Sequence, residues 1–150
     1  MSFQSLGLSE PLLRAVAERE HVQPTAVQAA IIPEVLRDRD VMATASTGSG
    51  KTAAFVLPIL EVLSHQELSS PRRVQALILV PTRELAAQID AEITSYGRYS
   101  RQHPKTVVVL GGVSINPQMM ALRGGADIVV ATPGRLLDLV DKNALSLSHV

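Results

Sequence analysis

Cysteine is absent from this chain of 150 residues, which removes disulfide bonds, thiolate metal ligands and cysteine nucleophiles together. The four histidines are scattered along the sequence and do not have the spacing of a zinc site. No apolar run is long enough to span a membrane, and the N-terminus lacks the basic-then-apolar pattern of a signal peptide. A cytoplasmic protein without membrane contact is therefore expected.

The chain also lacks net charge, since 14 lysines and arginines balance 14 aspartates and glutamates. Neutrality argues against bulk electrostatic attraction to nucleic acid or to an anionic membrane, so any polyanion must be bound by individually placed groups. Lysine occurs only as Lys51, Lys105 and Lys142, and arginine, the better residue for forked phosphate contacts, carries most of the positive charge. The length and a hydrophobic fraction of 46% predict a soluble globular chain that forms one domain or part of one.

Four continuous Val/Ile/Leu runs are typical of strands buried on both faces, and they lie at 41–44, 76–80, 106–110 and 128–131. Helical patterns follow them at 52–63, 84–96, 117–122 and 133–140. Two further helices are predicted near the N-terminus, one capped by Ser9 and one running from Pro24 to about Arg37. The alternation predicts an α/β fold, a doubly wound parallel sheet flanked by helices.

Residues 45–52 read Ala-Ser-Thr-Gly-Ser-Gly-Lys-Thr and predict a phosphate-binding loop. Glycines allow backbone N–H groups to surround phosphate oxygens, Lys51 supplies a cation for the β- and γ-phosphates, and the Thr52 hydroxyl can hold Mg²⁺. Ala45 stands where the usual pattern G-x-x-x-x-G-K-[ST] has its first glycine. The alternative is a Gly/Ser turn that happens to precede a lysine, but the predicted flanking strand and helix favour the phosphate site.

Thr25 and Gln28 have the spacing of a capping box, in which the two residues satisfy each other's backbone N–H groups at a helix start. The functional alternative is that the Gln28 amide, with a donor and an acceptor on one plane, reads an edge of adenine. Both interpretations remain open at the level of local sequence.

Three predicted strands end in similar turns. Pro81-Thr82-Arg83 and Thr132-Pro133-Gly134-Arg135 each combine a capping threonine with an arginine in the first helical turn, and Gly111-Gly112 follows a third strand. Each turn alone has an ordinary structural interpretation. Three at the same sheet edge favour an extended polyanion, because N-terminal amides and arginines contact phosphates without reading bases.

These blocks, together with Phe3, occur in the order found in the DEAD-box family of ATP-dependent RNA helicases, and the resemblance covers the whole chain. The family opens its phosphate loop with Ala-x-Thr-Gly, which accounts for Ala45. The start of the chain and residues 111–120 resemble the bacterial RhlE-type branch. The family usually has a glycine and an aromatic residue four residues before the Pro-Thr pair, where this chain has Glu20 and His21.

The resemblance implies two ligands, ATP with Mg²⁺ and the sugar-phosphate backbone of RNA bound without sequence preference. Lys51 and Thr52 would be catalytic, and Thr52 would hold the metal. The residues implied for ATP are Phe3, Thr25, Gln28, Ala45, Ser46, Thr47, Gly48, Ser49, Gly50, Lys51 and Thr52. The residues implied for RNA are Pro81, Thr82, Arg83, Gly111, Gly112, Thr132, Pro133, Gly134 and Arg135.

The resemblance also implies that these residues are a part of the first RecA-like domain, with N-terminal helices at 1–39 and an incomplete core at 40–150. The family's acidic Mg²⁺ block, its Ser-Ala-Thr block and the second RecA-like domain are not in this sequence. The 150 residues are therefore expected to bind adenine nucleotide, and RNA in part, without hydrolysing ATP. An exposed sheet edge is expected to lower their stability or cause self-association.

The sequence also bears on two other functions. One is a stand-alone module that binds nucleotide or RNA weakly and has no catalytic activity. A small-molecule kinase or GTPase would need a base-recognition sequence such as Asn-Lys-x-Asp, which the chain does not contain.

Overall fold

The computed structural model describes residues 1–67 and 69–150, and the chain forms two compact units. The first unit contains residues 1–66 and 92–103, and the second contains residues 67–91 and 104–150. No helix in the described residues is long and apolar enough to cross a membrane.

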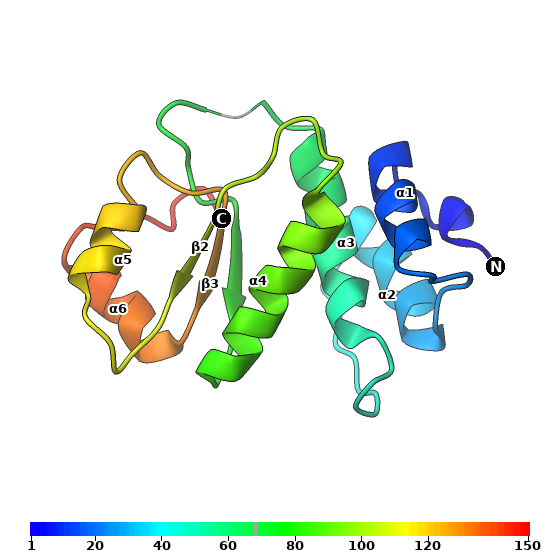
Figure 1. Ribbon diagram of the computed structural model, residues 1–150, viewed down its shortest axis with the longest axis horizontal. Helices are drawn as coiled ribbons and strands as arrows, with labels where there is room; N and C mark the ends of the chain where they lie inside the picture. The colour runs from blue at the N-terminus through cyan, green and yellow to red at the C-terminus, as the bar shows by residue number, and fades with distance from the viewer. Residues whose placement is uncertain (68) are drawn as a thin grey trace. The chain divides into compact units, whose positions relative to one another are not determined.

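The first unit is helical (Figure 1). It contains the 3₁₀ helix η1 (Phe3–Leu6), the helices α1 (Glu10–Glu18), α2 (Ala26–Leu36) and α3 (Lys51–Ser64), and the last turns of α4 (Arg83–Gly97). Large apolar side chains fill its core and are at most 2% exposed, among them Leu12, Ile32, Leu57, Leu60 and Tyr96. Burial raises the pKa of Tyr96 to about 12. The helices predicted from the sequence are all present.

The prediction that the Ser9 side chain caps α1 is wrong. The Ser9 side chain makes no capping hydrogen bond. Instead the Ser9 backbone N–H donates to Glu61 Oε2 of α3 at 2.8 Å, and Glu61 is buried. A carboxylate at a helix N-terminus is favoured by the helix dipole and accepts a stronger hydrogen bond than a hydroxyl. The cap of α1 therefore comes from a residue distant in sequence.

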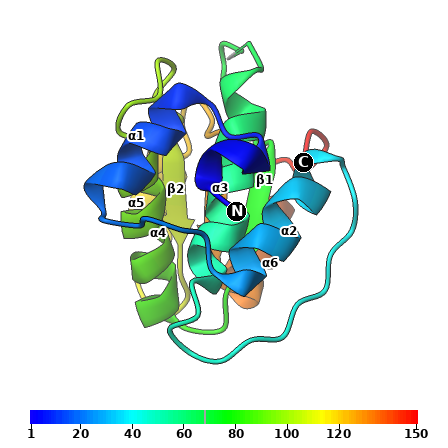
Figure 2. The same ribbon diagram turned by 90° about the vertical axis from the view of Figure 1, so that its right-hand side faces the viewer.

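The strand predicted at 41–44 is also absent. Figure 2 shows this segment within the long cyan connection between α2 and α3, without a strand arrow. Val41 is 42% exposed and Met42 is 99% exposed. The first unit, all of whose residues are described, contains no strand, so the backbone N–H and C=O groups of this segment have no partner strand. An apolar run forms a strand only where another strand can pair with it.

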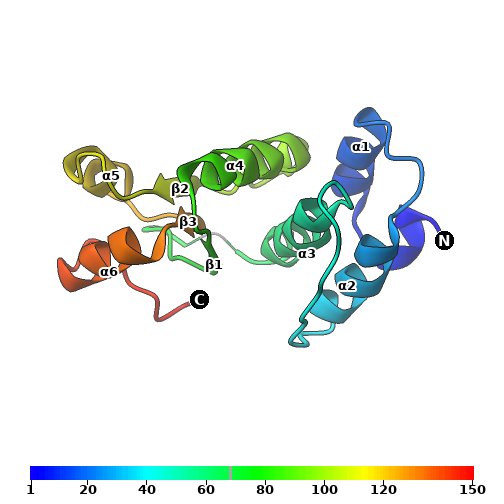
Figure 3. The same cartoon turned by 90° about the horizontal axis from the view of Figure 1, so that it is seen from below.

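The second unit contains a parallel three-stranded sheet of β1 (Ala76–Leu79), β2 (Thr106–Val109) and β3 (Ile128–Ala131), in the order β1-β3-β2. Figure 3 shows α5 (Asn116–Ala121) and α6 (Pro133–Asp141) on one face of the sheet and α4 on the other. Helices on both faces of a parallel sheet confirm the doubly wound α/β fold predicted from the sequence.

Burial within the sheet follows the strand order. Central β3 is buried at all four positions, whereas β2 alternates between buried and half-buried residues, and Leu79 at the end of β1 is 54% exposed. The prediction of strands buried on both faces therefore holds for β3 but not for β1 and β2, which within the described residues each pair with β3 alone. Val109, Val129 and Leu139 belong to the core that the sheet shares with α5 and α6.

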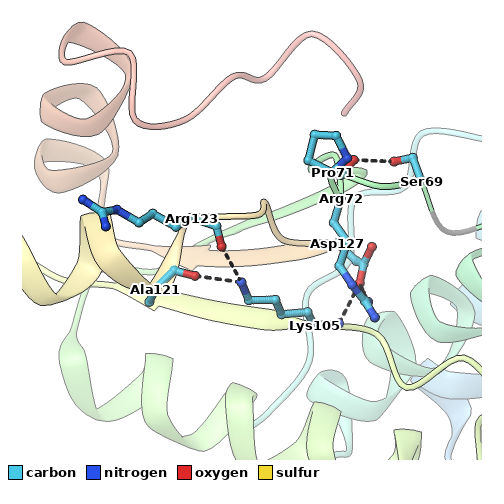
Figure 4. Close-up of polar contacts among 7 residues, drawn as sticks. All are labelled: Ser69, Pro71, Arg72, Lys105, Ala121, Arg123 and Asp127. Carbon is cyan, nitrogen blue, oxygen red and sulfur yellow. Dashed lines mark hydrogen bonds and ion pairs between the residues drawn. The ribbon is translucent and has the colours of Figure 1, made fainter.

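Asp127 connects the amino ends of the three strands (Figure 4). Its carboxylate accepts a hydrogen bond from the Lys105 backbone N–H at 2.7 Å and pairs with the Arg72 guanidinium. Its backbone C=O accepts from Gln75 N–H and Ala76 N–H, at 2.9 and 3.1 Å. The Asp127 side chain is 1% exposed. One buried carboxylate therefore holds the chain segments that lead into β1 and β2 beside the start of β3.

Candidate functional site

The loop at residues 45–52 ends in the first turn of α3, which begins at Lys51. Gly48 and Gly50 have φ angles of 78° and 85°, in the left-handed region that glycine adopts without strain. The first backbone N–H groups of a helix have no intrahelical partner and carry the positive end of its dipole. The Lys51 ammonium donates to the carbonyls of Ala45 and Ser46, at 2.5 and 2.6 Å. The loop thus surrounds its own lysine.

The donors of this loop fit a phosphate group. The first N–H groups of α3 and the Lys51 ammonium are two kinds of donor in the loop. A third is the buried Ser49 Oγ, which has no hydrogen-bond partner within the described residues. An orphaned buried hydroxyl next to an ammonium and a helix N-terminus is suited to an anionic oxygen. Thr52, in the first turn of α3, is half-buried and is the candidate metal ligand that the sequence predicts. The described residues contain no cluster of three or more His, Asp or Glu that could hold a metal.

The predicted capping box at α2 is confirmed. Thr25 Oγ1 accepts from Gln28 N–H at 3.4 Å, and Gln28 Oε1 accepts from Thr25 N–H at 3.0 Å. The amide also donates from Nε2 to the Gly50 carbonyl at 3.2 Å. A Cβ added at Gly50 would lie 2.4 Å from Gln28 Nε2, so the close approach requires glycine. Gln28 therefore joins the start of α2 to the end of the phosphate loop, a contact that local sequence does not predict.

Phe3 lies in a different part of the first unit. It lines a hollow of about 260 Å³ together with Leu13, Val16, Ala17 and His21. Phe3 itself is 5% exposed, while His21 is exposed. Gln28 is not among the residues that line this hollow. The structure thus brings Phe3 and His21 together and places Gln28 with the phosphate loop.

The strand-end site is defined as residues 81–83, 111–113 and 132–135, which all belong to the second unit. Thr82 accepts a hydrogen bond from Leu85 N–H at 3.2 Å, so its predicted role as a cap of α4 is confirmed. Thr132 makes no capping bond to α6, and this prediction is wrong. Its hydroxyl instead accepts from Gly111 N–H at 3.2 Å, because β2 and β3 are neighbours and end side by side. Thr132 therefore joins two of the three predicted blocks.

Arg83 joins the third block to the other two. A Cβ added at Gly112 would lie 2.1 Å from Arg83 Nη2, so the guanidinium rests on the glycine backbone, and Gly112 has a φ of 73°. Arg83 is exposed and has no carboxylate partner within the described residues. A cation in the first turn of α4 opposes the helix dipole, which favours a bound anion at this position.

Arg135 supplies a second guanidinium at the strand-end site. Its Nη2 donates to the Val113 carbonyl at 2.8 Å, and its Nε lies 3.9 Å from Asp138 Oδ2. The side chain is only 10% exposed, and Nη1 has no hydrogen-bond partner within the described residues. Pro81, Pro133 and Gly134 are exposed around these groups. Two arginines and the starts of α4 and α6 thus form a surface that can bind phosphate oxygens.

Gln118 is a site residue that the local sequence does not indicate. This residue of α5 donates from Nε2 to the Leu110 carbonyl at 3.0 Å, and its Oε1 accepts from Leu110 N–H at 3.2 Å. No local pattern indicates such a contact. The spacing of eight residues between the two partners is not that of any helical cap.

Comparison with known proteins gives a consistent result. The DEAD/DEAH box helicase family matches residues 25–150. The chain is 45% identical over 149 residues to the ATP-dependent RNA helicase DeaD of Escherichia coli K12, an alignment that covers 99% of this chain and 23% of that protein. It is 48% identical over 149 residues to the DEAD-box ATP-dependent RNA helicase 28 of Oryza sativa, which covers 97% of the chain and 18% of the relative. The chain thus spans about a fifth of the length of these relatives.

Among solved structures, a DEAD box protein from the hyperthermophile Methanococcus jannaschii superposes with a TM-score of 0.88 at 39% identity. The superposition covers all of this chain and 39% of that protein. At this identity the likeness extends to sequence as well as to fold.

Proposed function

We propose that this chain, which belongs to the DEAD/DEAH box helicase family, is the part of an RNA-stimulated ATPase that binds ATP and RNA. The whole protein would bind RNA and separate short duplexes locally. Membership of the RhlE-type branch is also part of this proposal. The observation that carries it is the strand-end site, where three separate sequence blocks meet around two guanidinium groups.

The phosphate loop would hold ATP by its own donors. Lys51 would exchange its bonds to the Ala45 and Ser46 carbonyls for bonds to β- and γ-phosphate oxygens. Thr52 would be the ligand for Mg²⁺, which when bound neutralises charge on those phosphates. The acidic block of the family is not in these 150 residues, so we expect this chain to bind ATP without hydrolysing it.

Two binding measurements test the proposal directly. We expect the purified chain to bind a fluorescent ATP analogue in the presence of Mg²⁺ and to bind single-stranded RNA in a salt-dependent manner. An RNA of scrambled sequence and equal length should bind equally well, because arginines and helix N-termini contact phosphates without reading bases. A chain that binds neither ligand at low ionic strength would refute the proposed function.

Gln28→Ala is expected to weaken binding of ADP by about tenfold while leaving the weaker binding of GDP unchanged. The capping box and the bond to Gly50 use one donor and one acceptor of the amide. An amide has two of each, so one N–H and one lone pair remain for adenine N7 and N6. Titration monitored by thermal shift measures both affinities.

The matched control is Gln23→Ala, since Gln23 is exposed just before the same helix. If Gln28→Ala weakens ADP and GDP binding equally, Gln28 acts only as a cap and as a support for the loop. In that case the adenine interpretation is wrong and the capping interpretation alone remains.

Arg83→Ala is expected to weaken binding of single-stranded RNA by about tenfold and to lower the salt slope of log K by about one. The reason is that the Arg83 guanidinium is exposed at the strand-end site and makes no ion pair within the described residues. Fluorescence anisotropy at several salt concentrations gives both quantities. Arg123→Ala is the control, because Arg123 is an exposed arginine of the same unit outside the strand-end site. Equal effects of the two substitutions would show that RNA binds to charge in general.

A further inference from the structure

The end of β2 is held by side chains on both of its edges. Val109 faces β3, since its C=O accepts from Thr132 N–H at 3.1 Å. Successive residues of a strand point their backbone groups to opposite edges, so the N–H and C=O of Leu110 point away from β3. No strand lies on that side in the described part of the sheet. The Gln118 amide bonds to both groups of Leu110, at 3.2 and 3.0 Å, in the manner of a neighbouring strand.

The residues after Leu110 are bonded from the opposite edge, by Thr132 and Arg135. Gly111 N–H donates to Thr132 Oγ1, and the Val113 C=O accepts from Arg135 Nη2. Between them Gly112 turns the chain with a φ of 73° and lies against Arg83. The bonds that Thr132 and Arg135 make to the turn at 110–113 therefore come from residues of the proposed RNA surface. Gln118 is the contact that fixes this turn from outside that surface.

We infer that Gln118 is a positioning residue for RNA binding. Its bidentate amide fixes Leu110, and through Leu110 it fixes the Gly111–Gly112 backbone on which Arg83 rests. This role depends on the proposed function, because it assumes that the strand-end site binds the RNA backbone. Gln118 itself lies on α5, is half-buried and uses its amide on Leu110, so no direct contact with RNA is required of it.

The geometry distinguishes two substitutions. Gln118→Leu has a similar size but removes both bonds to Leu110. Gln118→Glu retains an oxygen that can accept from Leu110 N–H, but at neutral pH it has no proton to donate and sets a carboxylate oxygen against the Leu110 carbonyl. Amide hydrogen exchange should therefore show the Leu110 N–H opened in the leucine variant and still protected in the glutamate variant.

RNA affinity should fall about tenfold in both variants, since neither holds the Leu110 carbonyl. Affinity for the fluorescent ATP analogue should be unchanged in both, because the phosphate loop belongs to the first unit. A general loss of folding would lower both affinities. A fall in RNA affinity with unchanged affinity for the ATP analogue is therefore specific to a positioning role. Gln88→Leu is the matched control, as Gln88 is an exposed glutamine on α4 of the same unit.

RNA affinity at the wild-type level in both Gln118 variants would overturn the inference. If the leucine variant does not fold, the glutamate variant tests the inference by the same comparison of RNA affinity with affinity for the ATP analogue. The two proposals fail differently. If the unsubstituted chain does not bind RNA, the proposed function is wrong. If it binds RNA but the Gln118 variants bind equally well, only the positioning role is wrong.

Discussion

Lys51→Ala is expected to weaken ATP binding by at least about 100-fold. The Lys51 ammonium is the positive side chain within the phosphate loop, and it is already held among the loop carbonyls of Ala45 and Ser46. It therefore has little conformational freedom left to lose when phosphate oxygens replace those carbonyls. Two charge-assisted bonds of about 1.5 kcal/mol or more each account for two orders of magnitude in affinity. Isothermal titration with ATP and Mg²⁺ measures the change.

The control for this substitution is Lys142→Ala, which removes an exposed lysine just after α6. Circular dichroism and RNA binding should be the same for both variants, because Lys51 lies outside the strand-end site. Lys51→Arg is also expected to bind ATP poorly, since a planar fork does not fit a space shaped around one ammonium. Unchanged ATP affinity in Lys51→Ala would exclude this loop as the nucleotide site.

Local sequence patterns predicted two kinds of element correctly: helices whose capping hydrogen bonds are local, and strands that are strongly apolar. The capping box at Thr25 predicted the start of α2, since both of its hydrogen bonds lie within four residues. The apolar run at 128–131 predicted β3, which is buried at every position. The run at 41–44, Val-Met-Ala-Thr, was also expected to be a strand, yet it forms none. Apolarity indicates that a segment can be buried, but it does not supply the neighbouring strand that satisfies its backbone.

Predictions of the site were limited in a similar way. The types of residue at the three strand ends were correctly identified as small residues and arginines, because each turn has its own composition. Among the residues at the strand ends, the bonding partner was predicted correctly for Thr82, which caps its own helix. Thr132 and Ser9 have the same local context as Thr82, but a neighbouring strand and a distant carboxylate change their bonds. Long-range partners decide among hydrogen bonds of similar energy, and local sequence does not contain them.

The second large effect is expected at the opposite end of the sheet. Asp127→Ala should lower the free energy of unfolding of the second unit by about 3 kcal/mol or more. The substitution removes the carboxylate partner of the Arg72 guanidinium and the acceptor of the Lys105 N–H. Both losses are severe because the Asp127 side chain is 1% exposed, so water does not readily replace it. Native-state amide exchange across β3 reports the change in this unit directly.

A graded series separates the contribution of the charge from that of the acceptor oxygen, because Arg72 and the Lys105 N–H both donate to Asp127 Oδ2. Asp127→Asn retains an acceptor oxygen but loses the charge and replaces the other carboxylate oxygen with an amide NH₂, so it should destabilise by less than Asp127→Ala. Asp141→Ala, which removes an exposed carboxylate of α6, should change the stability by no more than about 0.5 kcal/mol. Equal effects of alanine at positions 127 and 141 would contradict the role of Asp127. Because Asp127 holds the amino ends of the strands and the strand-end site lies at their carboxyl ends, Asp127→Asn should retain RNA affinity where the sheet stays folded. Stability and RNA binding in this unit are thus expected to respond to different residues of the same three strands.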